Sequence, residues 1–440
     1  MLYNILLISI DSLRADQCFG NNMTSKTPNI DLLRKNGISF TQAISSADGT
    51  GNCIGTVFSG LYPSKSGITH YTVNNTINNH LDILKNHNYR LITTAPDVSF
   101  FIKLGEYFDD ANFYKYDKKE HYQGLFGGIG EHIVNKLVEI EKNQPWFYFI
   151  HLMDLHWPFV IPENFDKIEY GTNRHERMLS AIDSWIGIFL QKINLKNTLV
   201  ILTSDHGEFI HIHEESYTPN VDKIFRTGKQ FVPQLEPLGL KLFVFTRNIA
   251  KTLLSARVKP ELNQKRALES RGTWNIYDDI INIPLIFSGI NFSKQIISQL
   301  VRQVDIFPTI LEILNLSCVK HTDGISLVPI IQGEKIDEIP AFIENASKDP
   351  KRLGNIIGIR SSTYKYFRAR SDQHFHVSLY NLTKDPFEQN NIAEIEKDKV
   401  LEMEKLLLEI TKNHEADYKL ELDEAERKKV EEELRKLGYL

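Results

Sequence analysis

Four short, nearly continuous apolar runs are spaced along the chain. They cover residues 5–10, 146–152, 198–203 and 283–287. Runs of this kind are typical of strands that are buried on both faces of a parallel sheet. Helical periodicity occurs between them and predicts helices at residues 30–36, 133–140 and 178–193. This alternation predicts an α/β protein with a mostly parallel central sheet flanked by helices.

Three parts of the chain depart from this alternation. Residues 214–271 are basic and irregular, and so long a connection predicts an insertion with helices of its own. Residues 356–368 and 375–382 resemble paired strands, which predicts a small antiparallel sheet, and residues 395–440 are charged and strongly helical. The predicted divisions are a large α/β domain, a small antiparallel subdomain and a charged helical tail, at residues 1–335, 336–395 and 396–440.

Composition places the chain among ordinary globular proteins, with 42% hydrophobic and 24% charged residues in 440. The formal net charge of −5 creates no overall attraction to nucleic acid or to an anionic membrane. Three cysteines are too few for a disulfide framework or a thiolate metal site. No apolar run reaches the ~18 residues of a membrane span, and the first residues show no secretion signal. We expect a cytoplasmic protein without a membrane span or a nucleic-acid partner, of open oligomeric state.

Acidic and imidazole side chains follow two of the predicted strands directly. Asp11 comes after the first apolar run, and Asp205 and His206 come after the third. Because the carboxyl ends of parallel strands meet at one edge of a sheet, these groups could converge on one divalent cation. For Asp11 alone, a helix N-cap is an equally good interpretation, and His206 alone could be a buried structural residue. The two strand-end groups together favour a metal site.

Short motifs in a fixed order carry a resemblance to a known family. A small-residue loop over residues 45–53 leads into a Ser-Gly-Leu-Tyr-Pro segment at 59–63, and alone this loop has only a structural interpretation. With the other motifs it resembles the sulfatase family of the alkaline-phosphatase superfamily, which implies that family's α/β fold. The other motifs are Asp11-Ser12-Leu13-Arg14-Ala15-Asp16, Thr27-Pro28-Asn29-Ile30, His151-x-x-Asp154-x-His156-x-Pro158-Phe159, Ser204-Asp205-His206-Gly207-Glu208, Val304-Asp305-Ile306-Phe307-Pro308, Asp323-Gly324-Ile325 and Leu379-Tyr380-Asn381-Leu382.

The nucleophile position departs from the family pattern. Active sulfatases carry a cysteine or serine there, within a C/S-x-P-S/A-R motif, and convert it to formylglycine. The family spacing places Thr50 at this position, and Asn52, Cys53 and Ile54 replace the rest of the motif. Threonine cannot become formylglycine, but it is the nucleophile of phosphodiesterases and phosphoglycerol transferases in the superfamily. The resemblance therefore implies phosphoryl transfer through Thr50, with Cys53 as a small buried filler.

The resemblance also implies a metal site formed by Asp11, Asp205, His206 and Thr50. A divalent cation at such a site favours loss of the hydroxyl proton and draws charge from the ester oxygens. Mostly oxygen donors with one imidazole favour one Mn²⁺, Mg²⁺ or Zn²⁺ ion. Ser12 stands where sulfatases place a further aspartate, so Ca²⁺, which takes about six to eight oxygens, is less favoured.

Two further residues are candidates for substrate contacts. His156 could contact an oxyanion or act as a general acid at the leaving oxygen, and a hydrogen-bonded structural histidine is the alternative. Arg271 lies near the position where relatives place a cation that touches the substrate anion, and a guanidinium binds such groups well. His151 is expected to be structural. His211 and His213 could hold a second cation, but one metal is the expectation.

Taken together, the motifs predict a metal-dependent hydrolase or transferase that acts on phosphate mono- or diesters through Thr50. The expected substrate is an anionic small-molecule, lipid or glycan ester. Two alternatives stay open: the scaffold could hydrolyse sulfate esters, or it could be a catalytically silent scaffold whose C-terminal helix binds partners.

Overall fold

The computed structural model of the chain describes residues 2–20, 23–116, 124–143, 145–156, 160–209, 276–317, 321–347, 354–412 and 428–433. The chain divides into two compact units, residues 1–208 with 271–440 and residues 209–270. All helices and strands named below belong to the first unit. The predicted insertion at 214–271 lies outside the described residues, and so does most of the predicted tail beyond residue 412.

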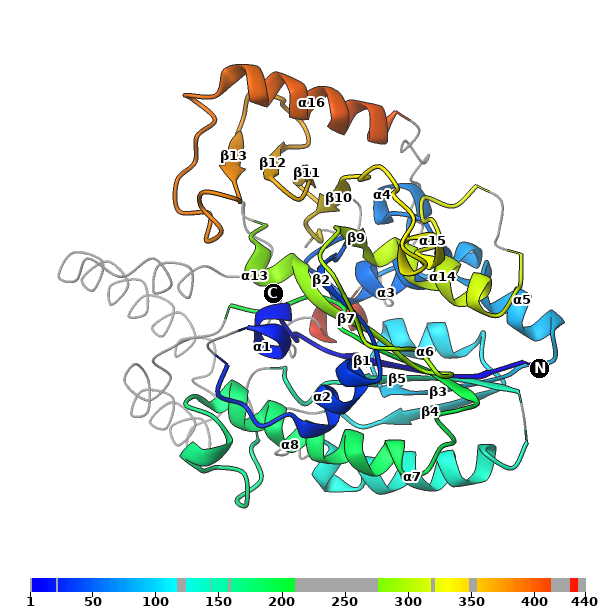
Figure 1. Cartoon of the computed structure of the whole chain (residues 1–440). Helices are drawn as coiled ribbons and strands as arrows, with labels where there is room; N and C mark the ends of the chain where they lie inside the picture. Colours follow the sequence, from blue (N-terminus) through cyan, green and yellow to red (C-terminus); the bar gives the residue numbers. More distant parts are fainter. Residues whose placement is uncertain are drawn as a thin grey trace. The chain divides into compact units, whose positions relative to one another are not determined.

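Nine strands of the described residues form the central sheet: β1 (Asn4–Ile10), β2 (Gly37–Ile44), β3 (Arg90–Pro96), β4 (Asp110–Tyr114), β5 (Trp146–Leu152), β6 (Thr198–Thr203), β7 (Asn282–Gly289), β8 (Gln295–Ile297) and β9 (Val301–Arg302). Their order is β4-β3-β5-β1-β6-β7-β2-β8, and β9 also pairs with β2 (Figure 1). Five neighbouring strands run parallel to one another, in the order β4, β3, β5, β1 and β6. β7 is antiparallel to both of its neighbours, β6 and β2. This sheet confirms the predicted mostly parallel α/β fold.

β1 lies in the middle of the sheet and is buried along its whole length. Successive side chains of a strand point to opposite faces, so Ile5 and Leu7 join one hydrophobic core while Leu6 and Ile8 join another. The two cores lie on opposite faces of the same sheet. The continuous apolar run at residues 5–10 therefore reflects burial on both faces, as its pattern predicted.

Helices cover both faces of the sheet (Figure 1). One core contains side chains from α3 (Thr50–Ser59), α5 (Leu81–Asn86), α6 (Ser99–Gly105), α14 (Ile306–Ile313) and α15 (Val328–Ile331). The other contains side chains from α1 (Ala15–Phe19), α2 (Pro28–Lys35), α7 (Ile129–Ile140) and α8 (Arg174–Leu190). The helices predicted at 30–36, 133–140 and 178–193 correspond to α2, α7 and α8. Among the described helices, none is both long and apolar enough to cross a membrane.

A separate antiparallel sheet follows, formed by β10 (Ala341–Glu344), β11 (Ile356–Arg360), β12 (Tyr364–Ala369) and β13 (Ser378–Asn381). α16 (Lys397–Thr411) packs on it through Met403 and Leu407, which are buried with residues of β11, β12 and β13. The predicted small C-terminal sheet is confirmed, and the predicted helical tail begins with α16. The remaining short elements are α4 (Pro63–Ser66), α13 (Asp278–Ile281), η1 (Asn75–Asn78), η3 (Gly124–Gly127), η4 (Ile168–Tyr170) and η6 (Gln303–Asp305).

Candidate active site

Asp11 and Asp205 lie at the carboxyl ends of two neighbouring parallel strands. Ser9 of β1 pairs in register with Thr203 of β6, and each aspartate follows two residues after its member of that pair. Backbone hydrogen bonding between β1 and β6 therefore brings the two carboxylates to the same level. Both side chains are fully buried. This is the convergence of strand-end groups that the sequence predicted.

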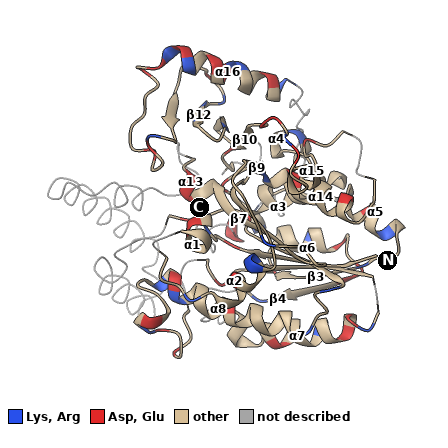
Figure 2. Ribbon diagram, viewed as in Figure 1, with Lys and Arg blue, Asp and Glu red and all other residues tan. Residues whose placement is uncertain are grey.

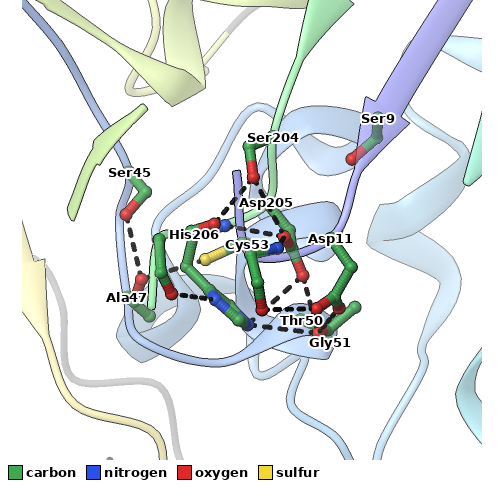
Figure 3. A network of polar contacts seen from close by, with 12 residues as sticks. Ser9, Asp11, Ser45, Ala47, Thr50, Gly51, Cys53, Ser204, Asp205 and His206 are labelled. Carbon is green, nitrogen blue, oxygen red and sulfur yellow. Dashed lines mark hydrogen bonds and ion pairs between the residues drawn. The ribbon is translucent and has the colours of Figure 1, made fainter. Parts of the chain in front are cut away.

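Thr50 reaches the same place as the first residue of α3, directly after Gly49. Its hydroxyl donates a hydrogen bond to Asp205 Oδ2 at 2.7 Å (Figure 3). The same oxygen lies 3.3 Å from Asp11 Oδ2 and 3.3 Å from His206 Nε2. The structure thus brings together all four residues predicted for the metal site, and their roles stay predictions.

The Oδ1 atoms of Asp11 and Asp205 accept hydrogen bonds from neighbouring groups. The Ser12 hydroxyl donates to Asp11 Oδ1 at 2.6 Å. The backbone N–H groups of Ser12 and His206 donate to Asp205 Oδ1 at 3.2 and 2.8 Å. Ser12 reaches both aspartates from a left-handed backbone with φ of 63°, a conformation that strains a non-glycine residue. The Oδ2 atoms are consequently the ones that face Thr50.

The imidazole of His206 is oriented by its own backbone. Its Nδ1 lies 2.9 Å from the Gly207 carbonyl oxygen, which can only accept a hydrogen bond, so Nδ1 carries the proton. Nε2 then presents a lone pair, and it lies 3.3 Å from Asp205 Oδ2 as well as from Thr50 Oγ1. A neutral imidazole held in this tautomer is the form that binds a metal ion.

The buried carboxylates of Asp11 and Asp205, which both contact the Thr50 hydroxyl, repel each other. Burial and the charge of Asp11 raise the pKa of Asp205. Burial would also raise the pKa of Asp11, but the neighbouring histidines, His151 foremost, hold that pKa well below its usual range. A divalent cation between the Oδ2 atoms would remove the repulsion, and oxygen donors with imidazole suit Mn²⁺, Mg²⁺ or Zn²⁺. The residues present therefore fit the cation that the sequence implies.

His151, expected to be structural, lies beside the same carboxylates. It pairs in register with Ser9 on the β5 side of β1, and its Nε2 is 3.7 Å from Asp11 Oδ2. Asp11, His151 and Asp205 each offer one ligand atom, and these atoms all lie within 4.8 Å of one another. The signal that could have revealed His151 is the strand order, because β5 and β6 flank β1.

Of the two predicted substrate-contact residues, the structure describes His156 but not Arg271. His156 lies four residues beyond the end of β5, is buried, and its Nδ1 is 3.1 Å from the Tyr116 hydroxyl. A protonated His156 lowers the pKa of Asp11, so it is close enough to act electrostatically on the site. Arg271, His211 and His213 lie outside the described residues.

Other neighbours support the site without belonging to the predicted set. Gln303 donates through Nε2 to the Asp205 carbonyl oxygen at 2.8 Å and so fixes the backbone after β6.

Cys53 donates through its thiol to the Ala47 carbonyl oxygen at 3.1 Å, and burial raises the pKa of this thiol well above its usual value. Cys53 is therefore the buried filler that we expected and is unsuited to act as a thiolate nucleophile.

The segments that follow β1 and β6 both contact α13 and the residues around it. The Gly207 N–H donates to the Ile280 carbonyl oxygen at 2.6 Å, and Arg14 forms an ion pair with Asp279 at 2.6 Å. A Cβ at Gly207 would lie 2.2 Å from the Asp279 carbonyl oxygen, so only glycine fits there. Figure 2, in which the ribbon is coloured by charged residue, shows acidic residues at α13.

Comparison with known proteins gives two family matches and partial matches to curated relatives. Residues 3–316 match the family described as Sulfatase, and residues 273–415 match the one described as N-sulphoglucosamine sulphohydrolase, C-terminal. Delta 4,5-hexuronate-2-O-sulfatase of Bacteroides thetaiotaomicron is 28% identical over 158 residues, 34% of this chain and 32% of that protein. Arylsulfatase K of Gallus gallus is 24% identical over 143 residues, 31% of this chain and 27% of that protein. The matched stretches thus span about a third of these relatives or less.

Solved structures resemble the chain over almost its whole length. The phosphonate monoester hydrolase of Agrobacterium radiobacter has a TM-score of 0.68 and 17% identity, covering 94% of this chain and 96% of that one. A protein solved in complex with its substrate D-glucosamine-2-N,6-O-disulfate has a TM-score of 0.64 and 16% identity, covering 95% and 99%. At these identities the likeness establishes the fold alone. The family match, in contrast, spans most of the sequence and contains Asp11, Thr50, Asp205 and His206. The chain therefore belongs to the sulfatase family, in the alkaline-phosphatase superfamily.

Proposed function

We propose that the chain is a metal-dependent hydrolase of sulfate or phosphate esters that uses Thr50 as its nucleophile. One observation carries this proposal. The Thr50 oxygen lies at 2.7–3.3 Å from Asp205 Oδ2, Asp11 Oδ2 and His206 Nε2, in a buried position at the end of the central strands. A threonine with no catalytic role has no need of two buried carboxylates and an imidazole around its hydroxyl.

The cation would be held by Asp11, Asp205 and His206, and when bound it would supply positive charge to the reacting oxygens. The protein positions the hydroxyl. The hydrogen bond to Asp205 and the start of α3 fix the direction of the Thr50 oxygen before substrate arrives. The N-terminal end of α3 also carries a partial positive charge, which favours an anionic group beside Thr50.

The reaction proceeds in two balanced steps. The Thr50 oxygen attacks sulfur or phosphorus in line while its proton passes to Asp205, the acceptor of its hydrogen bond, and the bond to the leaving oxygen breaks as His156 donates a proton to that oxygen. Water then attacks the same central atom and gives a proton to His156, Asp205 returns its proton to the Thr50 oxygen, and sulfate or phosphate is released. Threonine lacks the second hydroxyl of hydrated formylglycine, so water must attack the central atom directly.

The comparisons favour the sulfate-ester alternative over the phosphate-ester interpretation. The matched families and the curated relatives are named for sulfate hydrolysis, and one of the similar structures was solved with a sulfated glucosamine as its substrate. By analogy with these proteins, the first candidate substrate is a sulfated anionic glycan. The analogy transfers the class of substrate and no particular sugar.

A phosphate ester is the second candidate because Thr50 itself favours it. Hydrolysis at phosphorus through a hydroxyl nucleophile needs no formylglycine, and a metal ion with fixed donors serves that reaction well. The structural likeness to a phosphonate monoester hydrolase shows that the fold also occurs in an enzyme named for chemistry at phosphorus. The two candidates share the same residues and differ in the atom attacked.

The deciding experiment is a panel of matched esters that differ only in the acid. 4-Nitrophenyl sulfate, 4-nitrophenyl phosphate and the corresponding phosphonate are assayed with Mn²⁺, Mg²⁺ and Zn²⁺, together with glucosamine 6-sulfate and 6-phosphate. Transfer of ³⁵S or ³²P to Thr50 identifies the covalent step. Thr50→Ala is expected to abolish turnover, while Thr50→Ser, which keeps the hydroxyl, retains part of it. Undiminished turnover of Thr50→Ala would refute the nucleophile assignment.

Two broader expectations are tested alongside the panel. A catalytically silent scaffold would turn over none of the esters, and the metal content of the purified protein separates a silent scaffold with an intact site from one without a cation. The cytoplasmic location is also a proposal, and fractionation of cells that produce the native protein tests it. Recovery from a periplasmic or secreted fraction would overturn that location and leave the chemistry untouched.

A further inference from the structure

We propose that His151 is a direct ligand of the cation, so that two imidazoles, from His151 and His206, bind it together with the two carboxylates. A second imidazole makes the site selective for Zn²⁺ over Mg²⁺. This inference deepens the proposed function and rests on its cation. The sequence motif alone assigned His151 no role in the site.

The position of His151 is the first argument. β1 lies between β5 and β6, so His151 approaches the carboxylates from the β5 side, whereas His206 follows β6. The ligand atoms of Asp11, His151 and Asp205 all lie within 4.8 Å of one another. In a tetrahedral site with ~2.1 Å bonds, the ligand atoms lie about 3.4 Å apart. Since no two of these atoms are more than 4.8 Å apart, an approach of about 1.4 Å or less by each pair is sufficient for all three to bind one ion.

The unsatisfied nitrogen is the second argument. His151 is fully buried, and its Nε2 has no hydrogen-bond partner among the described residues. The 3.7 Å separation from Asp11 Oδ2 is too long for a hydrogen bond. Leaving such a buried polar atom unpaired costs about 1–3 kcal/mol, so the site implies a partner for it. A cation at the Asp11 and Asp205 oxygens is a partner of the right charge and in the right direction.

The ring of His151 is held in place for this role. Its Nδ1 lies 3.3 Å from Ser9 Oγ, and one face packs against the Phe101 ring with a centroid distance of 4.6 Å. The Phe149 ring lies 6.3 Å away on the same strand. A partner for one ring nitrogen and aromatic packing around the ring are the usual means of orienting a metal-binding histidine. Phenylalanine would fill the same space without offering a nitrogen.

Selectivity follows from the donor set. Imidazole nitrogen suits Zn²⁺, whereas Mg²⁺ strongly prefers oxygen ligands and keeps several waters. With His206 as the one imidazole the site suits both ions, and with His151 added it favours Zn²⁺. Loss of the His151 nitrogen should therefore weaken Zn²⁺ binding more than Mg²⁺ binding.

The test compares the unsubstituted protein with His151→Phe and with a matched control, His80→Phe. His80 is also a buried histidine, stacked on Phe307 with a 4.8 Å centroid distance, and its Nδ1 contacts the Phe58 carbonyl oxygen. Calorimetric titration gives Zn²⁺ and Mg²⁺ affinities, and electron spin-echo envelope modulation of bound Mn²⁺ counts coordinated imidazole nitrogens. We expect two imidazoles in the unsubstituted protein and in His80→Phe. We expect one in His151→Phe, with a Zn²⁺ affinity at least about tenfold lower.

The outcomes separate this inference from the function on which it rests. One imidazole in the unsubstituted protein, or unchanged Zn²⁺ affinity in His151→Phe, overturns the role of His151 and leaves the Thr50 mechanism standing. Absence of any cation binding by the unsubstituted protein overturns both. The imidazole count in the unsubstituted protein needs no variant, so it decides the question even where His151→Phe does not fold.

Discussion

Replacement of Lys365 by methionine tests how the small C-terminal sheet is joined to the central one. Lys365 of β12 is fully buried, and its Nζ lies 2.6 Å from Asp278 Oδ1 and 2.6 Å from Glu388 Oε1. Arg360 pairs with the other oxygen of Asp278 at 2.9 Å. Methionine keeps most of the volume of the lysine stem and removes its charge. Asp278 then keeps one cation, while Glu388 loses the cation that faces it.

The loss of unfolding free energy depends on the protonation of Glu388 and on the ion pair that Asp278 loses. Burial, together with the charge of Asp278, raises the pKa of Glu388 from 4.5 to about 7 even with Lys365 present. Without Lys365 the cheapest response is protonation of Glu388. With a pKa of about 7, Glu388 is already about half protonated at pH 7 and almost wholly protonated at pH 5, so completing its protonation costs about 0.4 kcal/mol at pH 7 and almost nothing at pH 5. The main loss is the ion pair between Lys365 and Asp278, because removal of one partner from a buried ion pair typically costs about 3–5 kcal/mol, and Arg360, which stays paired with Asp278, favours the lower end of that range.

The sign of the pH dependence is fixed by the raised pKa. A carboxyl with a raised pKa in the folded state stabilises the fold below its unfolded pKa, and this contribution is lost as pH rises through the folded pKa. Lys365→Met should therefore lower the free energy of unfolding by about 3 kcal/mol, with a loss slightly larger at pH 7 than at pH 5.

Urea denaturation followed by circular dichroism at both pH values measures this difference. The control is Lys397→Met, because Lys397 is 73% exposed and lies 3.7 Å from Glu394. Exposed pairs contribute little to stability, so we expect no measurable change in the control. A loss under about 1 kcal/mol at pH 7, or a loss clearly larger at pH 5 than at pH 7, would show that the buried network does not work as described.

Three further outcomes follow from the site. His206→Ala should weaken cation binding at least about tenfold, and unchanged occupancy by elemental analysis would exclude His206 as a ligand. Dialysis against a chelator should lower the melting temperature and abolish turnover, because a cation that binds the folded state stabilises it, and added cation should restore both. An unchanged melting temperature after dialysis would speak against a bound ion. Ser12→Gly relieves the left-handed backbone but removes the hydrogen bond to Asp11, so turnover should fall while stability changes little. Turnover equal to that of the unsubstituted enzyme would show that Ser12 does not position Asp11.

The sequence was sufficient for the parts of the fold that depend on burial alone. The buried strands β1, β5, β6 and β7 and the long helices α7 and α8 have strong periodicity and were predicted close to their observed bounds. β2 was missed because polar residues such as Thr41 and Gln42 interrupt it. The antiparallel direction of β7 was also not predicted, because an apolar run carries no information about direction.

The site was predictable to the extent that it follows from strand ends. Asp11, Asp205 and His206 could be placed together from the general rule for α/β sheets. Thr50 could not, because it comes from a helix start far along the chain, and only the family spacing assigned it. His151 was assigned a structural role since its proximity to Asp11 depends on strand order, which local patterns do not encode.

The hydrogen bond between Gly207 and Ile280 has a consequence for the rigidity of the candidate site. It ties the backbone that follows His206 to α13, and the ion pair between Arg14 and Asp279 ties the segment after β1 to the same short helix. α13 thus braces from outside the two strand ends that carry the acidic side chains. A substitution that displaces α13 should disturb Asp11 and Asp205 together, although it touches neither of them.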